Sequence, residues 1–185
     1  MPIRTLDPRT ALLVIDLQQG LVANPMLIQV DTVIERTAAL VSAFRSAGLP
    51  VVLANVDGAV AGRNDYARPP REQPDGYTTL IAELGQQSTD LTLTRAGWGA
   101  FVGTELNDTL KSLGVTQVVI AGIATSFGVE STAREAYGLG YNVTLATDAM
   151  TDMNADAHTR SLTWIFPALG ETGPTADLIE VLAAR

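Results

Sequence analysis

Few side chains in this sequence can carry out acid–base, nucleophilic or metal chemistry. The chain has no cysteine, one histidine (His158) and one lysine (Lys111) among its 12 basic residues, so the others are arginine. Thiol nucleophiles, disulfides and Cys-based zinc or iron–sulfur sites are therefore excluded, and so is a metal site built from several histidines. Any chemistry must come from carboxylates, arginine, hydroxyls, amides, backbone groups or those two residues.

Several polar residues directly follow short apolar runs. Asp16 follows 11–15, Asn55 and Asp57 follow 50–54, Arg95 follows 91–94, and Asp148 comes just after 141–146. If these runs are parallel strands, their carboxyl ends meet at one sheet edge, where ligands bind in open α/β sheets. Asp16 is then either a general acid or base with a pKa tuned by burial, or a structural carboxylate paired with an arginine. Arg95 could pair with Asp16, clamp a ligand carboxylate or form a structural salt bridge.

The segment Gly122–Gly128 is predicted to be a strand-to-helix turn. Its backbone N–H groups could bind an oxyanion or carboxylate, or could simply begin a well-capped helix. Ser126 within it resembles a relaxed nucleophile elbow, and Asp148 and His158 follow in the order of a Ser–Asp–His triad. Against this serine-hydrolase alternative, His158 falls within an apparent helix only 158 − 126 = 32 residues later.

The surrounding pattern alternates between strands and helices. Lys111 lies on a polar helix face, which speaks against a Schiff-base role, and glycine-rich phosphate-binding motifs are absent. The alternation predicts one doubly wound α/β domain over residues 1–185. The least regular stretch, Gly58–Asp90, is long enough to cover a site. The predicted strands are 11–15, 50–54, 91–94, 117–121 and 141–146, and the predicted helices are 31–46 (capped by Asp31), 104–113, 126–138, 154–165 and 175–183 (capped by Thr175).

The composition and net charge of the chain limit the kinds of molecule that it can bind. The 185 residues are 46 % hydrophobic and 17 % charged, which is ordinary for a globular protein. A net charge of −8 without a basic run disfavours binding to nucleic acid or to an anionic membrane. The first apolar stretch, 11–15, is too short for a signal peptide or a membrane span, so we expect a cytoplasmic protein.

Five segments together resemble the isochorismatase-like, or cysteine hydrolase, superfamily: 11–18, 94–104, 121–134, 140–143 and 147–149. This resemblance implies a three-layer α/β/α fold with a mainly parallel sheet of about six strands. The superfamily usually has an Asp–Lys–Cys triad, whose positions fall on Asp16, Arg95 and Gly128. Its nicotinamidase-type members hold a metal with histidines after the second strand, but no histidine follows Asp57 there. We therefore expect no metal and no cofactor.

The resemblance also limits the chemistry. Without the cysteine, thioester chemistry is lost, yet true isochorismatases also have glycine there and cleave a vinyl ether with aspartate and lysine. A permanently charged arginine should favour ionised Asp16. The first hypothesis is a cysteine-independent hydrolase of a small anionic metabolite, such as isochorismate. The alternative is an inactive member that binds a small molecule.

The resemblance further implies a cis peptide at Ile123–Ala124 and assembly into a homodimer or homotetramer. Asp16, Arg95 and Gly128 are the predicted catalytic positions. The predicted substrate-binding residues are Gln18, Asn55, Trp98, Phe101, Ile123, Ala124, Thr125 and Phe127.

Overall fold

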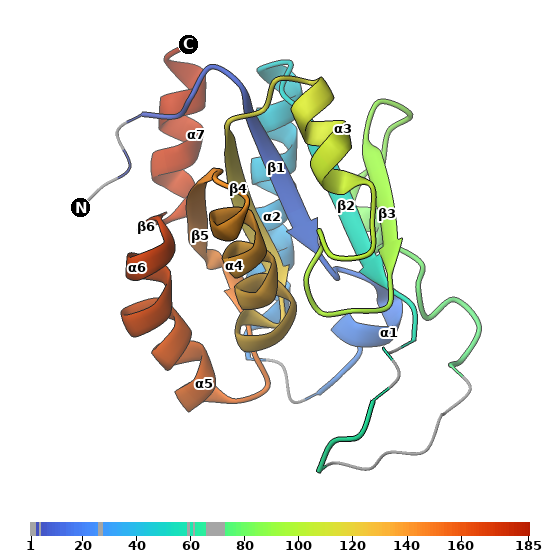
Figure 1. The fold of residues 1–185 in the computed structure, drawn as a ribbon. Coiled ribbons are helices and arrows are strands. Elements are labelled where there is room, and N and C mark those ends of the chain that lie inside the picture. Colours follow the sequence, from blue (N-terminus) through green and yellow to red (C-terminus); the bar gives the residue numbers. More distant parts are fainter. Residues whose placement is uncertain (1–2, 4, 26–27, 59, 61, 66–72) are drawn as a thin grey trace.

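A computed structural model describes residues 3, 5–25, 28–58, 60, 62–65 and 73–185. Six parallel strands form one sheet in the order β3-β2-β1-β4-β5-β6, flanked by helices (Figure 1). This confirms the predicted doubly wound α/β fold. The strands are β1 (Thr10–Ile15), β2 (Val51–Val56), β3 (Leu91–Arg95), β4 (Gln117–Ile123), β5 (Asn142–Thr151) and β6 (Glu171–Gly173). The helical segments are α1 (Gln19–Val22), α2 (Val30–Ser46), η1 (Ala82–Leu84), α3 (Leu106–Ser112), η2 (Thr125–Val129), α4 (Glu130–Gly138), α5 (Ala155–Arg160), η3 (Ser161–Ile165), α6 (Phe166–Leu169) and α7 (Thr175–Ala183).

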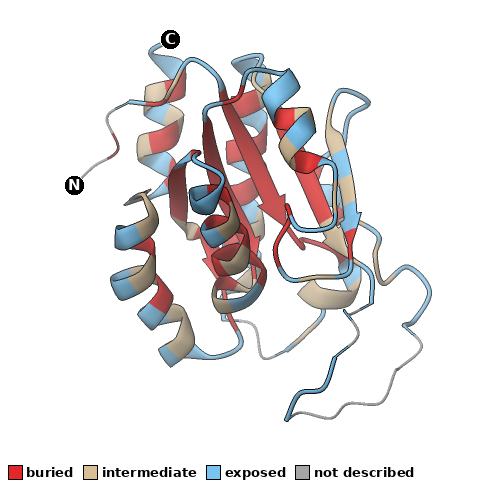
Figure 2. Cartoon of the chain, viewed as in Figure 1, coloured by how far each residue is buried: buried red, intermediate tan, exposed pale blue. Residues whose placement is uncertain are grey.

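The central strands β1 and β4 are buried along their whole length because helices cover both faces of the sheet (Figure 2). Successive residues of β1 point to opposite faces. Leu12 and Val14 belong to the core shared with α2 and α7, whereas Leu13 and Ile15 belong to the core shared with α3, α4 and α6. A hydrophobic core therefore packs against each face of the sheet, and the two cores together determine where its strands end.

The strand order reverses between β1 and β4, which places a crevice at their carboxyl ends. Ile15 lies opposite Gly122 in this pair. Gly122 has φ 117°, and a Cβ there would collide with the carbonyl oxygen of Ile15, so the close approach of the two strands requires glycine. Directly after β1, Asp16 adopts φ 55° in the left-handed region, which turns the chain out of the sheet.

Several predicted boundaries need correction. The strand predicted at 141–146 continues to Thr151, because its register against β4 shifts between Ile120 and Gly122. Helix α2 begins one residue before Asp31, which lies in its first turn rather than at its cap. Thr175 is likewise the first residue of α7 and not its cap. The helix predicted at 154–165 is present, but its second half, η3, is a π-helical turn.

The long irregular stretch predicted at 58–90 is described at 58, 60, 62–65 and 73–90. Its last part runs antiparallel to the chain that follows β1, with a bridge between Gln18 and Leu80. Gln19 donates a backbone hydrogen bond to Thr79, and Ile81 donates one to Leu17. This part of the stretch therefore packs beside the carboxyl end of β1. No helix in the described residues is long and apolar enough to cross a membrane.

Candidate functional site

Asp16 and Arg95 form a buried ion pair at the carboxyl ends of β1 and β3. Nη1 of Arg95 donates to Oδ1 of Asp16 at 2.6 Å, and Nη2 donates to Oδ2 at 2.9 Å. The exposed fractions of the two side chains are 7 % for Asp16 and 1 % for Arg95. This two-pronged geometry is the strongest arrangement of an arginine and a carboxylate. Of the alternatives for Arg95, pairing with Asp16 is the one that the structure shows.

The rest of the guanidinium is held by the loop that follows β3. Nε of Arg95 donates to the carbonyl of Gly99 at 3.1 Å, and Nη2 also donates to the carbonyl of Trp98 at 2.8 Å. All three guanidinium nitrogens are therefore engaged by the protein. The expectation that Arg95 clamps a ligand carboxylate finds no support in this geometry, since the guanidinium is buried and already paired.

Helix α4 and its preceding turn hold that loop in place. The Thr132 hydroxyl donates to the carbonyl of Gly128 at 2.7 Å and accepts from the Ala100 amide at 3.2 Å. The Glu135 carboxylate accepts from the Phe101 amide at 2.8 Å. A Cβ at Gly99 would collide with this carboxylate. Glu135 and Thr132 therefore position the loop whose carbonyls orient Arg95, and the sequence patterns did not identify either residue.

Gly128 lies directly against the ion pair. A Cβ at this position would lie 3.1 Å from Oδ2 of Asp16, 3.2 Å from Nη2 of Arg95 and 2.9 Å from Cγ2 of Ile15. The three positions predicted to be catalytic are therefore brought together by β1, β3 and η2. Any side chain at Gly128 would touch both charged groups.

Burial dominates the protonation of Asp16. Removal from water raises the pKa of its carboxyl above the ordinary value, while the hydrogen bonds and the charge of Arg95 act in the opposite direction. The expectation that the arginine favours the ionised form agrees with the contribution of Arg95 to the pKa. Desolvation, which the expectation did not include, is the larger effect and sets the net direction.

Two predicted aromatic residues gather beside the pair and one does not. Trp98 and Phe127 pack edge to face with ring centroids 4.9 Å apart, and Trp98 is 62 % exposed. Both residues lie next to predicted catalytic positions. The carbonyl oxygen of Trp98 accepts a hydrogen bond from Arg95, and Phe127 directly precedes Gly128. Phe101 instead is buried against Tyr141 and lines a cavity of about 380 Å³ that also involves residues of α3 and α4.

Gln18 and Asn55 are engaged by nearby backbone. Nε2 of Gln18 donates to the carbonyls of Val56 and Tyr77, and its Oε1 accepts from the Val56 amide at 2.7 Å. Nδ2 of Asn55 donates to the carbonyl of Thr78 at 2.8 Å. By strand alternation Asn55 lies on the α2 face of β2, with Leu53. Both residues tie the covering stretch to the sheet, while Oδ1 of Asn55 is buried without a hydrogen-bond partner in the described part of the chain. Their contact with substrate stays a prediction.

The turn after β4 contains the predicted cis peptide between Ile123 and Ala124. Ile123 is buried, and so is Thr125, which begins η2. The Thr125 hydroxyl lies 2.8 Å from Nδ1 of His158 in α5. Burial lowers the pKa of His158, against an opposing contribution from the charge of Asp152. The only histidine therefore contacts the turn that carries Gly128.

The three residues of the alternative serine triad have other partners. Ser126 donates its hydroxyl to Asp152 at 2.8 Å and its amide to the same oxygen at 2.7 Å. Asp148 accepts from the Thr175 amide at 2.7 Å and pairs with Arg36 at 2.9 Å. With His158 bonded to Thr125 (above), no hydrogen bond among the described residues joins the triad members. Asp148 is not at the strand end either, because it lies inside β5.

Sequence patterns did not single out Tyr77, which contacts Gln18 and Gly20 in the segment that follows Asp16. The charges of Asp16 and Asp57 both act on its hydroxyl. The tyrosine lies 77 − 16 = 61 residues from Asp16 in an irregular stretch, so no periodic pattern marks it. The signal that could have found it was the expectation that residues 58–90 cover a site.

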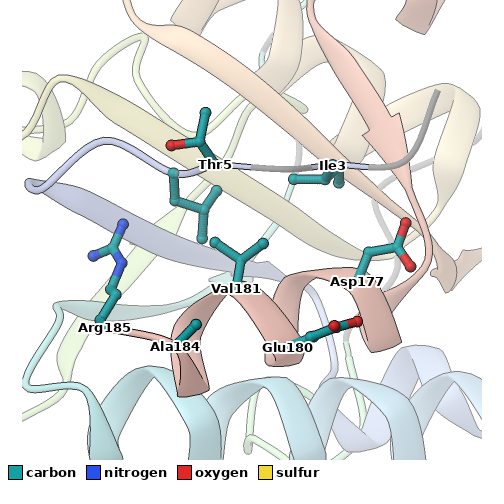
Figure 3. A pocket seen from close by; sticks show the side chains of 8 residues that line it. Ile3, Thr5, Asp177, Glu180, Val181, Ala184 and Arg185 are labelled. Carbon is teal, nitrogen blue, oxygen red and sulfur yellow. The ribbon is translucent and has the colours of Figure 1, made fainter.

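Other places in the molecule offer less chemistry. A cavity of about 540 Å³ lies between the N-terminal segment and α7, lined by Thr5, Asp177, Glu180 and Arg185 (Figure 3). Part of its lining comes from residues 3, 5 and 6, which precede β1, whereas Asp16 follows the carboxyl end of that strand. Among the residues that the structure describes, no group of three or more Asp, Glu or His side chains is arranged to hold a metal ion.

Comparison with known proteins identifies the relatives of this chain. The isochorismatase domain family matches residues 10–177. The uncharacterized isochorismatase family protein YwoC of Bacillus subtilis is 38 % identical over 179 residues, with 93 % of each chain covered. The uncharacterized isochorismatase family protein YecD of Escherichia coli is 35 % identical, with 94 % of this chain and 96 % of the relative covered. The structure of an isochorismatase family protein from Burkholderia thailandensis superimposes with a TM-score of 0.92 at 39 % identity, over 98 % of this chain and 99 % of that one.

Proposed function

The chain belongs to the isochorismatase family, and from this premise we propose that it is a hydrolase of a small anionic metabolite that works without a cysteine nucleophile. The family cysteine position falls on Gly128 and the family lysine on Arg95. The observation that carries the proposal is that Gly128 faces the buried Asp16–Arg95 pair without a side chain between them. Asp16 is then the one acid–base group in contact with the reacting atoms.

A vinyl ether such as isochorismate suits this arrangement. In its protonated form, Asp16 gives its proton to the methylene carbon of the vinyl ether, and water then adds to the resulting oxocarbenium ion as the proton released by the water passes to the Asp16 carboxylate. The hemiketal then collapses into pyruvate and an alcohol. Burial supports this role because it raises the pKa of Asp16 above its ordinary value, although Arg95 acts in the opposite direction. Arg95 cannot be the proton donor because a guanidinium stays charged, so it orients and balances Asp16.

Contacts with the rest of the substrate fall to the residues around the pair. We propose that Trp98 and Phe127 pack against its apolar part. The backbone of Ile123, Ala124 and Thr125 would line the opposite side. Gln18, Asn55 and Phe101 position these elements instead of touching the substrate.

One observation favours a second function, a small-molecule-binding protein without catalysis. Both carboxylate oxygens of Asp16 are already held by Arg95. A pair locked in this way could shape a binding pocket and never exchange a proton. The two functions differ in whether replacing Asp16 affects turnover or only structure.

The deciding experiment is a screen of small carboxylates, including isochorismate, with detection of released pyruvate or alcohol. We expect turnover by the wild type and a loss of about 10²–10⁴-fold in Asp16→Asn. Circular dichroism of Asp16→Asn should show an intact fold. A ligand that binds both proteins equally and is turned over by neither would establish the binding function instead.

Three sequence-based expectations remain proposals: one domain over residues 1–185, a cytoplasmic location, and a homodimer or homotetramer. Light scattering during size-exclusion chromatography measures the last of these directly.

A further inference from the structure

The proposed site must hold an anionic substrate, yet its arginine is not free to bind one. The Arg95 side chain is 1 % exposed, and each of its nitrogens is paired with Asp16 or with a carbonyl of the following loop. The charge of Arg95 is also balanced by Asp16. The hydrogen-bond donor for an oxygen of the substrate must therefore come from another residue at this edge of the sheet.

Tyr77 is fixed beside the chain that leaves β1. Its carbonyl accepts from Nε2 of Gln18 and from the amide of Gly20, both at 3.0 Å. The Gln18 amide in turn donates to the carbonyl of Asp16 at 2.8 Å. The Tyr77 ring packs over Gly20, where a Cβ would collide with it. These contacts lock the ring against the segment 16–20 and account for the glycine at position 20.

The Tyr77 hydroxyl is a neutral donor on a ring that packs against the segment directly after Asp16. Burial, together with the negative charges of Asp16 and Asp57, raises the pKa of Tyr77, so the phenol keeps its proton at neutral pH. The residue is half-buried and accessible. Within the described part of the chain, no hydrogen bond uses its hydroxyl. A fixed, uncharged O–H with no protein partner is suited to bind an acceptor from outside the chain.

We propose that the Tyr77 hydroxyl binds a carboxylate or ether oxygen of the substrate beside Asp16, and so takes the recognition role that Arg95 cannot fill. This inference rests on the proposed function, because it concerns the same site and the same small anionic substrate. Arg95 is then a positioning residue for Asp16, and Tyr77 determines which substrates can be held against it.

The first test measures the pKa of the Tyr77 phenol, which responds to the negative charges near it. The tyrosinate absorbance of the wild type, minus that of Tyr77→Phe, isolates the titration of Tyr77. We expect Asp57→Asn and Asp16→Asn to lower its pKa, because each removes a nearby negative charge. Asp57 is exposed, so its variant keeps the test valid if Asp16→Asn folds poorly. Asp75→Asn, also exposed and only two residues from Tyr77, is the matched control and should leave the pKa unchanged.

The second test measures binding with pyruvate and benzoate as probes, by calorimetry. We expect Tyr77→Phe to bind at least one probe roughly tenfold more weakly than the wild type, the scale of one hydrogen bond to a charged group. Tyr137→Phe, an exposed tyrosine on α4, is the control and should bind as the wild type does.

The inference is overturned if neither probe binds the wild type, if Tyr77→Phe keeps full affinity for both, or if Asp57→Asn and Asp16→Asn leave the Tyr77 titration unchanged. Neither measurement needs turnover. Loss of probe affinity in Tyr77→Phe without turnover of any substrate would therefore retain this inference while rejecting the proposed hydrolase.

Discussion

Gly128 and Arg95 are sterically coupled, since a Cβ on the glycine would lie 3.2 Å from Nη2 of the arginine. The same Cβ would lie 2.9 Å from Cγ2 of Ile15, which is closer than real Cβ contacts allow. Arg95 donates hydrogen bonds from two nitrogens to Asp16. In this position it fits beside a glycine at position 128, but it would crowd any larger residue there. If Arg95 and Gly128 occupy the lysine and cysteine positions of the family triad, as we propose, the two departures belong together for this physical reason.

We therefore predict that Gly128→Ala lowers the free energy of unfolding by about 1–3 kcal/mol, the usual cost of forcing an extra carbon into a packed interior. Urea denaturation measures this change. Gly138→Ala is the matched control, because Gly138 ends α4 and a Cβ there meets nothing within 4 Å. It should be neutral or stabilising by about 0.5–1 kcal/mol. Equal effects of the two substitutions would show that the crowding at Gly128 is relieved at no cost.

The loop that orients Arg95 should loosen when Glu135 changes. Its carboxylate accepts hydrogen bonds from the amides of Phe101 and Val102. In Glu135→Gln these bonds lose their charge assistance, so we expect faster hydrogen exchange at both amides. Glu105→Gln is an exposed control on the same stretch of chain. Unchanged exchange at Phe101 in Glu135→Gln would mean that Thr132 and local packing hold the loop without the carboxylate.

Much of this site follows from where apolar runs end. Asp16 was identifiable because it directly follows the buried strand β1, and Arg95 because it ends the short edge strand β3; parallel strands bring their carboxyl ends together. Local sequence patterns are sufficient for the central strands, because burial on both faces favours continuous apolar runs.

Other features depend on contacts between distant segments. The extension of β5 to Thr151 depends on a register shift against β4, which no pattern within β5 reveals. Asp148 was misplaced for the same reason. Tyr77 lies beside the chain after β1 only because residues 77–81 pair with that chain, and the pairing lies in an irregular stretch. The net direction of the Asp16 pKa depends on its burial, which adjacency to Arg95 alone did not predict.

Acidification should weaken the contact between α5 and η2. The pKa of His158 in the folded protein lies below its value of about 6.5 in the unfolded chain. Between these two pKa values the folded protein therefore binds fewer protons than the unfolded chain. Stability is then fully present above about pH 6.5 and declines as the pH falls through the folded pKa. We predict that the melting temperature of the wild type falls from about pH 7.5 to 5 by more than that of His158→Gln, which cannot titrate. Parallel curves for the two proteins would contradict this account.

Ser126 should not behave as a nucleophile. Its hydroxyl donates to Asp152, and no described contact places His158 beside it as a base. A fluorophosphonate probe should therefore leave Ser126 unmodified in peptide mass analysis. Labelling of Ser126 that disappears in His158→Ala would instead revive the serine-hydrolase alternative and remove Asp16 from its proposed role.

Arg95→Lys tests whether Arg95 only positions Asp16, which is the proposed proton donor. A lysine can approach one oxygen of Asp16, but it loses the paired contact and the Nε hydrogen bond to the carbonyl of Gly99. We expect this variant to lose about 1–3 kcal/mol of unfolding free energy, because buried carbonyls lose their donor. With a substrate from the screen, KM should stay near the wild-type value, since Arg95 is not proposed to touch the substrate. Turnover should persist, because the lysine still balances the charge of Asp16. A large rise in KM with kcat preserved would show that position 95 binds substrate directly, and Tyr77 would then lose the recognition role assigned to it.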